Sequence, residues 1–166
     1  MRLERPMPEI VEGNLVVDRG VRFAVVASRF NDVVTSRLIE GAMGAFTRHG
    51  VAEKDVRIVR VPGSFEIPVT ARRLAAGGQF GAVVCLGALI RGETPHFDYL
   101  AAEVARGAGQ VALETGVPVI FGVLTTETLE QALDRAGGKA GNKGWDAALA
   151  AIEMVNLLGR LGTERG

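Results

Sequence analysis

The 166-residue chain has one cysteine and two histidines, and it carries no excess of charge of either sign. Because Cys85 cannot form an internal disulfide, we expect a reducing compartment, the cytoplasm. One cysteine and two histidines also leave too few ligands for a metal cluster, so no metal is predicted. Nineteen basic residues balance nineteen acidic ones, which argues against a nucleic-acid partner.

Long apolar runs are also missing. No run approaches the roughly 18 residues of a membrane span, and the first fourteen residues lack the apolar core of a secretory signal. We therefore expect no membrane partner. Hydrophobic residues still make up 48% of the chain, which is enough for one core at this length. We predict a single domain over residues 10–158, between a mobile tail at residues 1–9 and a second tail at residues 159–166.

Short apolar runs alternate with longer stretches of helical periodicity. The runs that predict buried strands are residues 21–27, 56–61, 81–86 and 117–124. The stretches that predict helices are residues 32–49, 64–76, 94–115, 126–136 and 145–158. This alternation predicts right-handed crossovers and an α/β fold, a three-layer αβα sandwich around four parallel strands. Residues 14–17 indicate a further strand at the N-terminus.

Ligands of an open parallel sheet bind beyond the carboxyl ends of its strands. Phe30 and Phe65 directly follow two predicted strands, where an aromatic ring serves either as core or as a ligand platform. Glu66 either binds polyol hydroxyls or only favours the start of its helix, and Asn31 is most simply a helix N-cap.

The segment Gly92-Glu93-Thr94-Pro95-His96 reads as the start of a helix. Threonine is a good N-cap and proline is favoured at the first helical position, so free N–H groups lie beside a glycine. Such a helix start binds phosphate readily. His96 in the first turn could transfer a proton, or it could be an ordinary, partly exposed residue.

Arg135 and the glycine-rich residues 137–144, GGKAGNKG, offer a second place for an anion. Arg135 could cap the end of a helix, or its guanidinium could clamp a phosphate. The glycine-rich segment does not fit a P-loop because Gly144 follows Lys143, and no GxGxxG follows a predicted strand. A nucleotidase and a Rossmann dehydrogenase are both disfavoured.

Five segments, in unbroken order between residues 10 and 158, together resemble the lumazine synthase family. They are residues 28–31 (SRFN), 61–68 (VPGSFEIP), 87–99 (GALIRGETPHFDY), 118–126 (PVIFGVLTT) and 130–154, with Arg135 and GGKAGNKG. The resemblance implies a flavodoxin-like sandwich and a transferase without a cofactor. That enzyme condenses 5-amino-6-(D-ribitylamino)uracil with 3,4-dihydroxy-2-butanone 4-phosphate and releases phosphate and water. The product is 6,7-dimethyl-8-ribityllumazine, the immediate precursor of riboflavin.

The same resemblance assigns roles by motif. Residues for the pyrimidine and ribityl groups would be Phe30, Ser64, Phe65, Glu66, Ala88, Leu89, Ile90, Phe121 and Lys143. Gly92, Glu93 and Thr94 would cradle the phosphate, with Arg135 as its clamp, and His96 would transfer protons. Phe121, Arg135 and Lys143 match residues that an adjacent subunit contributes.

The family resemblance also implies a homo-oligomer, a pentamer that in some members builds a 60-subunit icosahedral shell. The short GGKAGNKG connection and residues 10–17, which resemble the segment that joins a neighbour's sheet, favour the shell. Pro6 and Pro8 limit how far such a strand could extend. Riboflavin synthase is a further candidate partner.

Three alternatives stay open at this point. The chain could be an archaeal-type riboflavin synthase, a flavodoxin-like module that binds flavin or lumazine, or a shell protein without synthase activity. The HFDY segment and GGKAGNKG fit the lumazine synthase pattern better than the first alternative.

Overall fold

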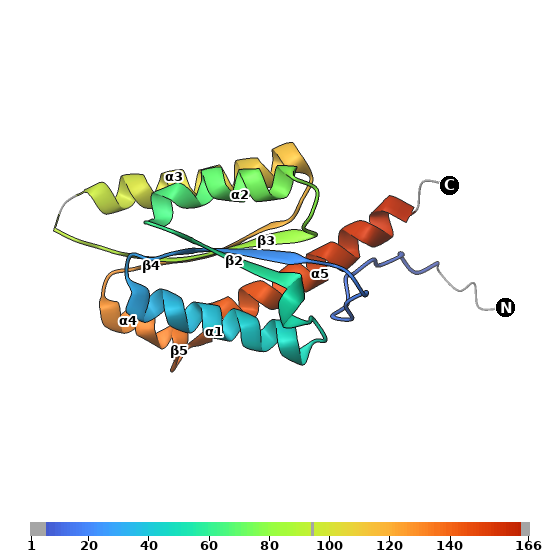
Figure 1. The fold of residues 1–166 in the computed structure, drawn as a ribbon, viewed down its shortest axis with the longest axis horizontal. Helices are drawn as coiled ribbons and strands as arrows, with labels where there is room; N and C mark the ends of the chain where they lie inside the picture. The colour runs from blue at the N-terminus through green and yellow to red at the C-terminus, as the bar shows by residue number, and fades with distance from the viewer. Residues whose placement is uncertain (1–5, 94, 164–166) are drawn as a thin grey trace.

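The computed structural model describes residues 6–93 and 95–163 (Figure 1). Thr94, the first five residues and the last three lie outside this description, and with them part of the predicted phosphate loop and of both predicted tails. Four strands form one sheet in the order β2-β1-β3-β4, and every neighbouring pair is parallel. They are β1 (Phe23–Ser28), β2 (Val56–Val61), β3 (Ala82–Ile90) and β4 (Val119–Thr126). The predicted four-stranded parallel sheet is confirmed.

Helices cover both faces of this sheet. On one face lie α1 (Asp32–Arg48), the short α4 (Leu129–Asp134) and α5 (Lys143–Thr163), and on the other lie α2 (Ile67–Ala76) and α3 (His96–Thr115) (Figure 1). The predicted αβα sandwich is therefore confirmed. None of the helices in the described ranges is long and apolar enough to cross a bilayer.

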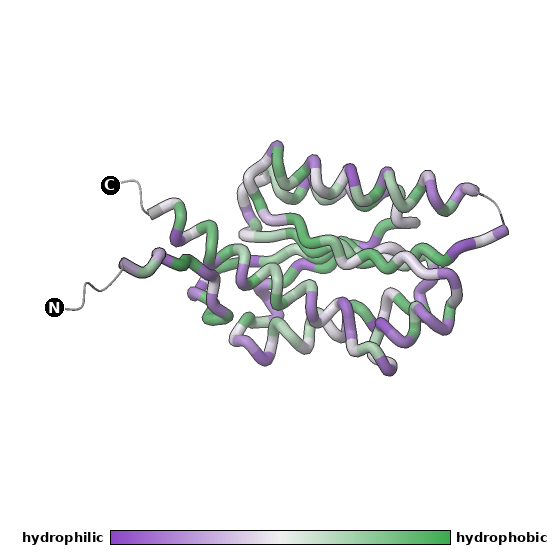
Figure 2. The backbone as a smooth tube through the Cα atoms, turned by 180° about the vertical axis from the view of Figure 1, so that it is seen from behind, coloured by the Kyte–Doolittle hydropathy of each residue, from purple (hydrophilic) through white to green (hydrophobic). Residues whose placement is uncertain are grey.

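The residues of β1 show how one strand builds two cores. Phe23, Val25 and Ala27 pack on the α1 and α5 side, while Ala24 and Val26 pack on the α2 and α3 side, because alternate side chains of a strand point to opposite faces. All of them are fully buried, so the strand reads as a continuous apolar run. Figure 2 shows the same concentration of hydrophobic residues in the middle layer.

Several boundaries differ from the prediction. β3 continues to Ile90, four residues past its predicted end, because its last residues still pair with β4. The predicted helix over residues 64–76 begins with a separate 3-10 turn, Ser64–Glu66, and a second such turn, Glu53–Asp55, precedes β2. α5 begins at Lys143 and runs to Thr163, so it is longer than the predicted residues 145–158.

The glycine-rich segment before α5 is a small antiparallel hairpin rather than a plain connection. Its strands are β5 (Ala136–Gly138) and β6 (Gly141–Asn142). Gly137 and Gly141 have positive φ angles of 108° and 81°, which glycine adopts without strain. The Lys143 N–H donates to the Arg135 carbonyl oxygen at 2.8 Å, so the hairpin brings these two residues together.

Residues 14–17 form no strand in the described chain. Asn156 on α5 instead donates through Nδ2 to the carbonyl oxygens of Asn14 and Val16, at 2.7 and 2.9 Å. The segment therefore lies along α5 with its polar backbone groups partly bonded. A strand that forms only against a neighbouring subunit stays a prediction.

Replacing Gly144 with alanine is expected to destabilise the protein by about 1–3 kcal/mol, the usual cost of overpacking. A Cβ at this position would overlap the carbonyl oxygen of Leu38, because α5 begins directly against α1. Gly159→Ala on the same helix is the control, since no atom lies within 4 Å of its Cβ position. Calorimetry should show a lower melting temperature for Gly144→Ala only. Equal temperatures would contradict this packing.

The buried thiol of Cys85 makes stability fall at alkaline pH. Burial raises the pKa of Cys85 from 9.0 to about 12, because the interior disfavours the thiolate. This contribution to stability is complete below pH 9.0 and is lost as the pH rises towards 12. Chemical unfolding between these pH values should therefore show a steeper decline for the wild type than for Cys85→Ala. Equal slopes would contradict the raised pKa.

Candidate active site

A cavity of about 350 Å³ opens at the carboxyl ends of β1, β2 and β3. This is where an open parallel sheet is expected to bind its ligands. Its lining residues are Phe30, Asn31, Gly63, Ser64, Phe65, Glu66, Ala88, Leu89, Ile90, Gly92, His96, Phe97 and Leu100. Ten residues that the sequence singled out therefore meet at one cavity.

Phe30 is held at the cavity by the turn between β1 and α1. The Arg29 and Phe30 N–H groups donate to the carbonyl oxygens of Val61 and Pro62, at 2.7 and 3.1 Å, which ties this turn to the end of β2. Phe30 is 70% exposed, so it is not a core residue of this chain, and its role as a ligand platform stays a prediction.

Asn31 stands at the N-cap position of α1, as predicted, but its side chain does not cap the helix. Its Nδ2 donates to the carbonyl oxygen of Ala88 on β3 at 2.7 Å. The backbone of Asn31 is left-handed, with φ 61° and ψ 45°, a conformation that asparagine tolerates better than most residues. The side chain thus joins the end of β1 to the end of β3 across the cavity.

The turn at Ser64–Glu66 presents polar groups to the same cavity. Glu66 accepts the Gly63 N–H at Oε2, at 3.0 Å, so the carboxylate caps the turn and also lines the cavity. The Ser64 side chain is buried beside Gly87. A Cβ at Gly87 would lie 2.7 Å from Ser64 Oγ and 3.1 Å from Ser28 Oγ, so glycine there leaves room for both hydroxyls.

The segment after β3 leads directly into α3. The helix begins at His96, and Pro95 occupies the N-cap position rather than the first helical position that the sequence predicted. Thr94, the predicted N-cap, lies outside the described residues. His96 is exposed and lines the cavity with Gly92, whereas Glu93 is exposed beside it and does not line it.

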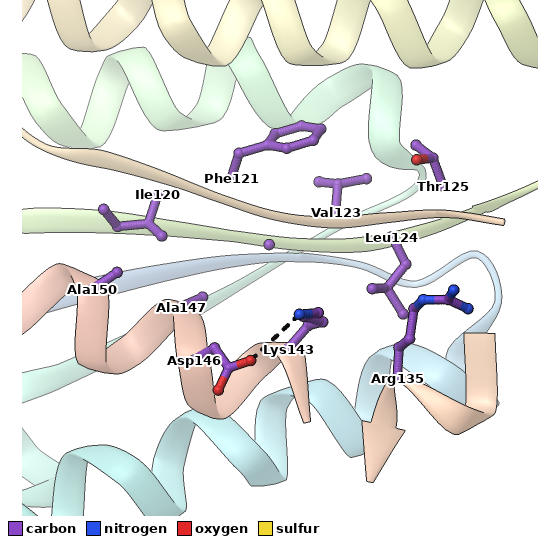
Figure 3. Close-up of a pocket in the computed structure, with 11 residues that line it drawn as sticks. Ile120, Phe121, Val123, Leu124, Thr125, Arg135, Lys143, Asp146, Ala147 and Ala150 are labelled. Atoms are coloured by element: carbon purple, nitrogen blue, oxygen red, sulfur yellow. Dashed lines mark ion pairs between the residues drawn. The ribbon is translucent and has the colours of Figure 1, made fainter. Parts of the chain in front are cut away.

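A second cavity, of about 410 Å³, lies between β4 and the start of α5 (Figure 3). It is lined by Phe121, Arg135 and Lys143, the three residues assigned to an adjacent subunit. In Figure 3, Phe121 projects from one side of β4 and the two cations lie on the other side. Phe121 is 43% exposed, and Lys143 Nζ lies 3.6 Å from Asp146 Oδ2.

Arg135 fulfils one of its two predicted roles in the isolated chain. Its Nη1 donates to the carbonyl oxygen of Gln131 at 3.0 Å, which caps the end of α4. The guanidinium still borders the second cavity, and a guanidinium carries five N–H donors in all. The cap is confirmed, and the clamp on phosphate stays a prediction.

The two cavities share no lining residue. The structure thus brings together the predicted residues of one group, apart from Glu93 and the undescribed Thr94, and places Phe121, Arg135 and Lys143 at another cavity. That a site built from both groups combines the first cavity of one chain with the second cavity of another stays a prediction.

Sequence reasoning missed Gly63, Phe97 and Leu100 among the residues that line the first cavity. Leu100 follows His96 by four residues on α3, and residues at this spacing share a helix face. That spacing was available in the sequence. Nothing in the sequence showed that the side chain of Asn31 reaches Ala88, because the two residues meet only in the folded chain.

A parallel αβα sandwich with a concave site at the carboxyl edge of its sheet is typical of α/β proteins that bind small molecules. A profile of the family described as 6,7-dimethyl-8-ribityllumazine synthase matches residues 20–159. The chain belongs to this family, which confirms the resemblance of its five motifs.

Two relatives carry the same description. One, from Syntrophus aciditrophicus, is 57% identical over 152 residues, which cover 92% of this chain and 98% of the relative. The other, from Desulfotalea psychrophila, is 56% identical over 155 residues, which cover 93% of this chain and 99% of the relative. The similarity therefore extends over nearly the full length of each relative.

Proposed function

We propose that this protein condenses 5-amino-6-(D-ribitylamino)uracil with 3,4-dihydroxy-2-butanone 4-phosphate to 6,7-dimethyl-8-ribityllumazine. The observation that carries the proposal is the first cavity, which joins an exposed aromatic ring, a carboxylate and a histidine at a helix start. Membership of the family and the names of the two relatives support the same reaction.

The polar and aromatic groups of the cavity suit the uracil substrate. Phe30 offers an open ring face on which a pyrimidine can stack. Glu66 keeps one carboxylate oxygen on Gly63 and can accept ribityl hydroxyls with the other, next to the buried Ser64. Phe65 and the end of β3, Ala88, Leu89 and Ile90, would line the ring pocket.

The start of α3 suits the phosphorylated ketone. The first N–H groups of a helix have no intrahelical acceptor and, with the helix dipole, favour a phosphate near residues 92–94. Gly92 leaves open space there, since no atom lies within 4 Å of its Cβ position. Arg135 of an adjacent chain would complete the phosphate site with charge-assisted hydrogen bonds.

The chemistry requires positioning and proton transfer. The amine nitrogen of the uracil attacks the ketone carbon, and the ketone oxygen leaves as water, which forms an imine. Loss of a proton from the next carbon expels phosphate from the terminal carbon. After tautomerisation, the ribitylamino nitrogen attacks the resulting carbonyl, and a second water leaves as the ring closes. His96, which lines the cavity, would accept and return these protons.

The protein would act as a homo-oligomer whose active site lies between adjacent chains. The separation of Phe121, Arg135 and Lys143 from the first cavity supports this division. We propose a pentamer, and a 60-subunit icosahedral shell because the connection before α5 is only the short hairpin. Residues 10–17 would add to a neighbour's sheet. Cytoplasmic location and association with riboflavin synthase belong to the same proposal.

The direct test is to incubate the purified protein with both substrates. Lumazine absorbance and an equal amount of released phosphate should appear together. Their absence at saturating substrate would contradict the proposal and leave a binding module or a shell protein without activity. Negative-stain imaging of the same sample separates pentamers from shells.

A further inference from the structure

Arg91 is the first residue after β3, and its side chain binds two other elements at once. Its Nη1 and Nη2 donate to the two carboxylate oxygens of Asp98, at 3.2 and 3.0 Å, and Asp98 lies in the first turn of α3. Its Nε lies 2.8 Å from Oε2 of Glu127, which follows β4. One guanidinium therefore joins the ends of β3 and β4 to the start of α3.

The backbone and the guanidinium of Arg91 make further contacts. Its backbone N–H donates to the Thr126 carbonyl oxygen at 2.8 Å, which extends the pairing of β3 with β4 by one residue. Its guanidinium also lies over the ring of Phe97, 4.6 Å from the ring centre, and Phe97 lines the first cavity. The hydrogen bond to Asp98, above all, raises the pKa of Arg91, so the group is charged at every relevant pH.

We propose that Arg91 is a positioning residue that fixes the first turn of α3, and with it His96, relative to the end of β3. His96 lies next to Phe97 and two residues before Asp98, so Arg91 contacts the two residues that directly follow His96 in the first turn of α3. Without them, the connection after β3 would hold this turn less firmly. The effect of Arg91 on kcat rests on the proposed function, because it is measured with the proposed condensation.

The geometry calls for arginine rather than for any cation. The two Nη groups form a fork on Asp98 while Nε lies close to Glu127, and Cζ lies over the Phe97 ring. An ammonium group offers one point charge and no such plane. Because exposed ion pairs contribute little to overall stability, loss of Arg91 should change catalysis far more than melting temperature.

The kinetic test compares Arg91→Gln and Arg91→Lys with Arg72→Gln. Arg72 is a matched control because it also pairs with a carboxylate of α3, Glu114, at 3.0 Å and far along the helix from His96. We expect Arg91→Gln to lower kcat about 10- to 100-fold, the effect of a small misplacement, with little change in KM for the uracil. Arg72→Gln should stay within about twofold of the wild type.

A substitution of Asp98, whose carboxylate binds Arg91, tests the same contact even if Arg91→Gln does not fold. Asp98→Asn should lower kcat to a similar extent. The double variant should have nearly the same kcat as Arg91→Gln, because both substitutions remove the same contact between Arg91 and Asp98. Asp98→Glu, which keeps the carboxylate, should recover part of the loss. Wild-type kcat in both Arg91→Gln and Asp98→Asn would overturn the inference.

Amide hydrogen exchange tests the same contact without activity. In Arg91→Gln the amides of the first two turns of α3 should exchange faster, while Arg72→Gln should leave them unchanged. Unchanged exchange in Arg91→Gln overturns the inference. If the wild type makes no lumazine, the proposed function fails, and the exchange result still decides the role of Arg91.

Discussion

His96→Ala is expected to lower kcat by about 10²- to 10³-fold, within the range that general acid–base catalysis contributes. The alanine removes the group that takes up and returns protons but leaves the cavity and its polar contacts in place. Some activity should therefore remain, and KM for both substrates should change little. Steady-state kinetics with each substrate varied in turn measures both effects.

The chain provides its own control for this prediction, since its other histidine lies elsewhere. His49 follows α1, its Nδ1 lies 2.7 Å from the Ala45 carbonyl oxygen, and its ring contacts Trp145. His49→Ala should leave kcat within about twofold of the wild type in the folded enzyme. A His96→Ala enzyme with wild-type kcat would show that the proton is transferred by another group.

Arg135→Ala is expected to raise KM for the phosphorylated ketone about 10- to 100-fold, which corresponds to the loss of charge-assisted hydrogen bonds. KM for the uracil should change much less, because Arg135 is assigned to the phosphate alone. The same arginine also caps α4 through the Gln131 carbonyl oxygen, so fraying of α4 is a second cause of a higher KM that a control must separate.

Thr128→Ala separates these two causes. Thr128 Oγ1 accepts the Gln131 N–H at 3.1 Å, so this variant loses the N-terminal cap of α4 without touching the guanidinium of Arg135. If Arg135 binds phosphate, Thr128→Ala keeps a wild-type KM for the ketone. An equal rise in both variants would assign the effect to α4.

The fold was largely predictable because its central strands are buried on both faces. A strand such as β1, with every side chain fully buried, leaves a continuous apolar run that a sequence shows directly. The hairpin β5–β6 left no such signal, since its short strands are mostly glycine and owe their shape to positive φ angles. Residues 14–17 carry a strand-like pattern but form no strand in the described chain, where Asn156 donates to the carbonyl oxygens of Asn14 and Val16.

The candidate site was also predictable from the sequence only in part. Phe30, Glu66 and His96 were found because each follows a strand, and the carboxyl ends of parallel strands share one edge. The contacts of Arg91 could not be found, since they join segments after β3, in α3 and after β4 that meet only on folding. The prediction that Phe121 and Arg135 belong to another chain came from family resemblance, and their separate cavity is consistent with it.

The division of the active site between neighbouring chains is tested most directly by mixing His96→Ala and Arg135→Ala subunits. The two variants are unfolded, combined in equal amounts and refolded into mixed oligomers. The mixture is assayed with the ketone well below the raised KM of Arg135→Ala, so that each variant alone has little activity. A chain with intact His96 then meets a neighbour with intact Arg135 at about a quarter of the sites, so about a quarter of wild-type activity should return. Activity no higher than the mean of the two variants alone would contradict a shared site.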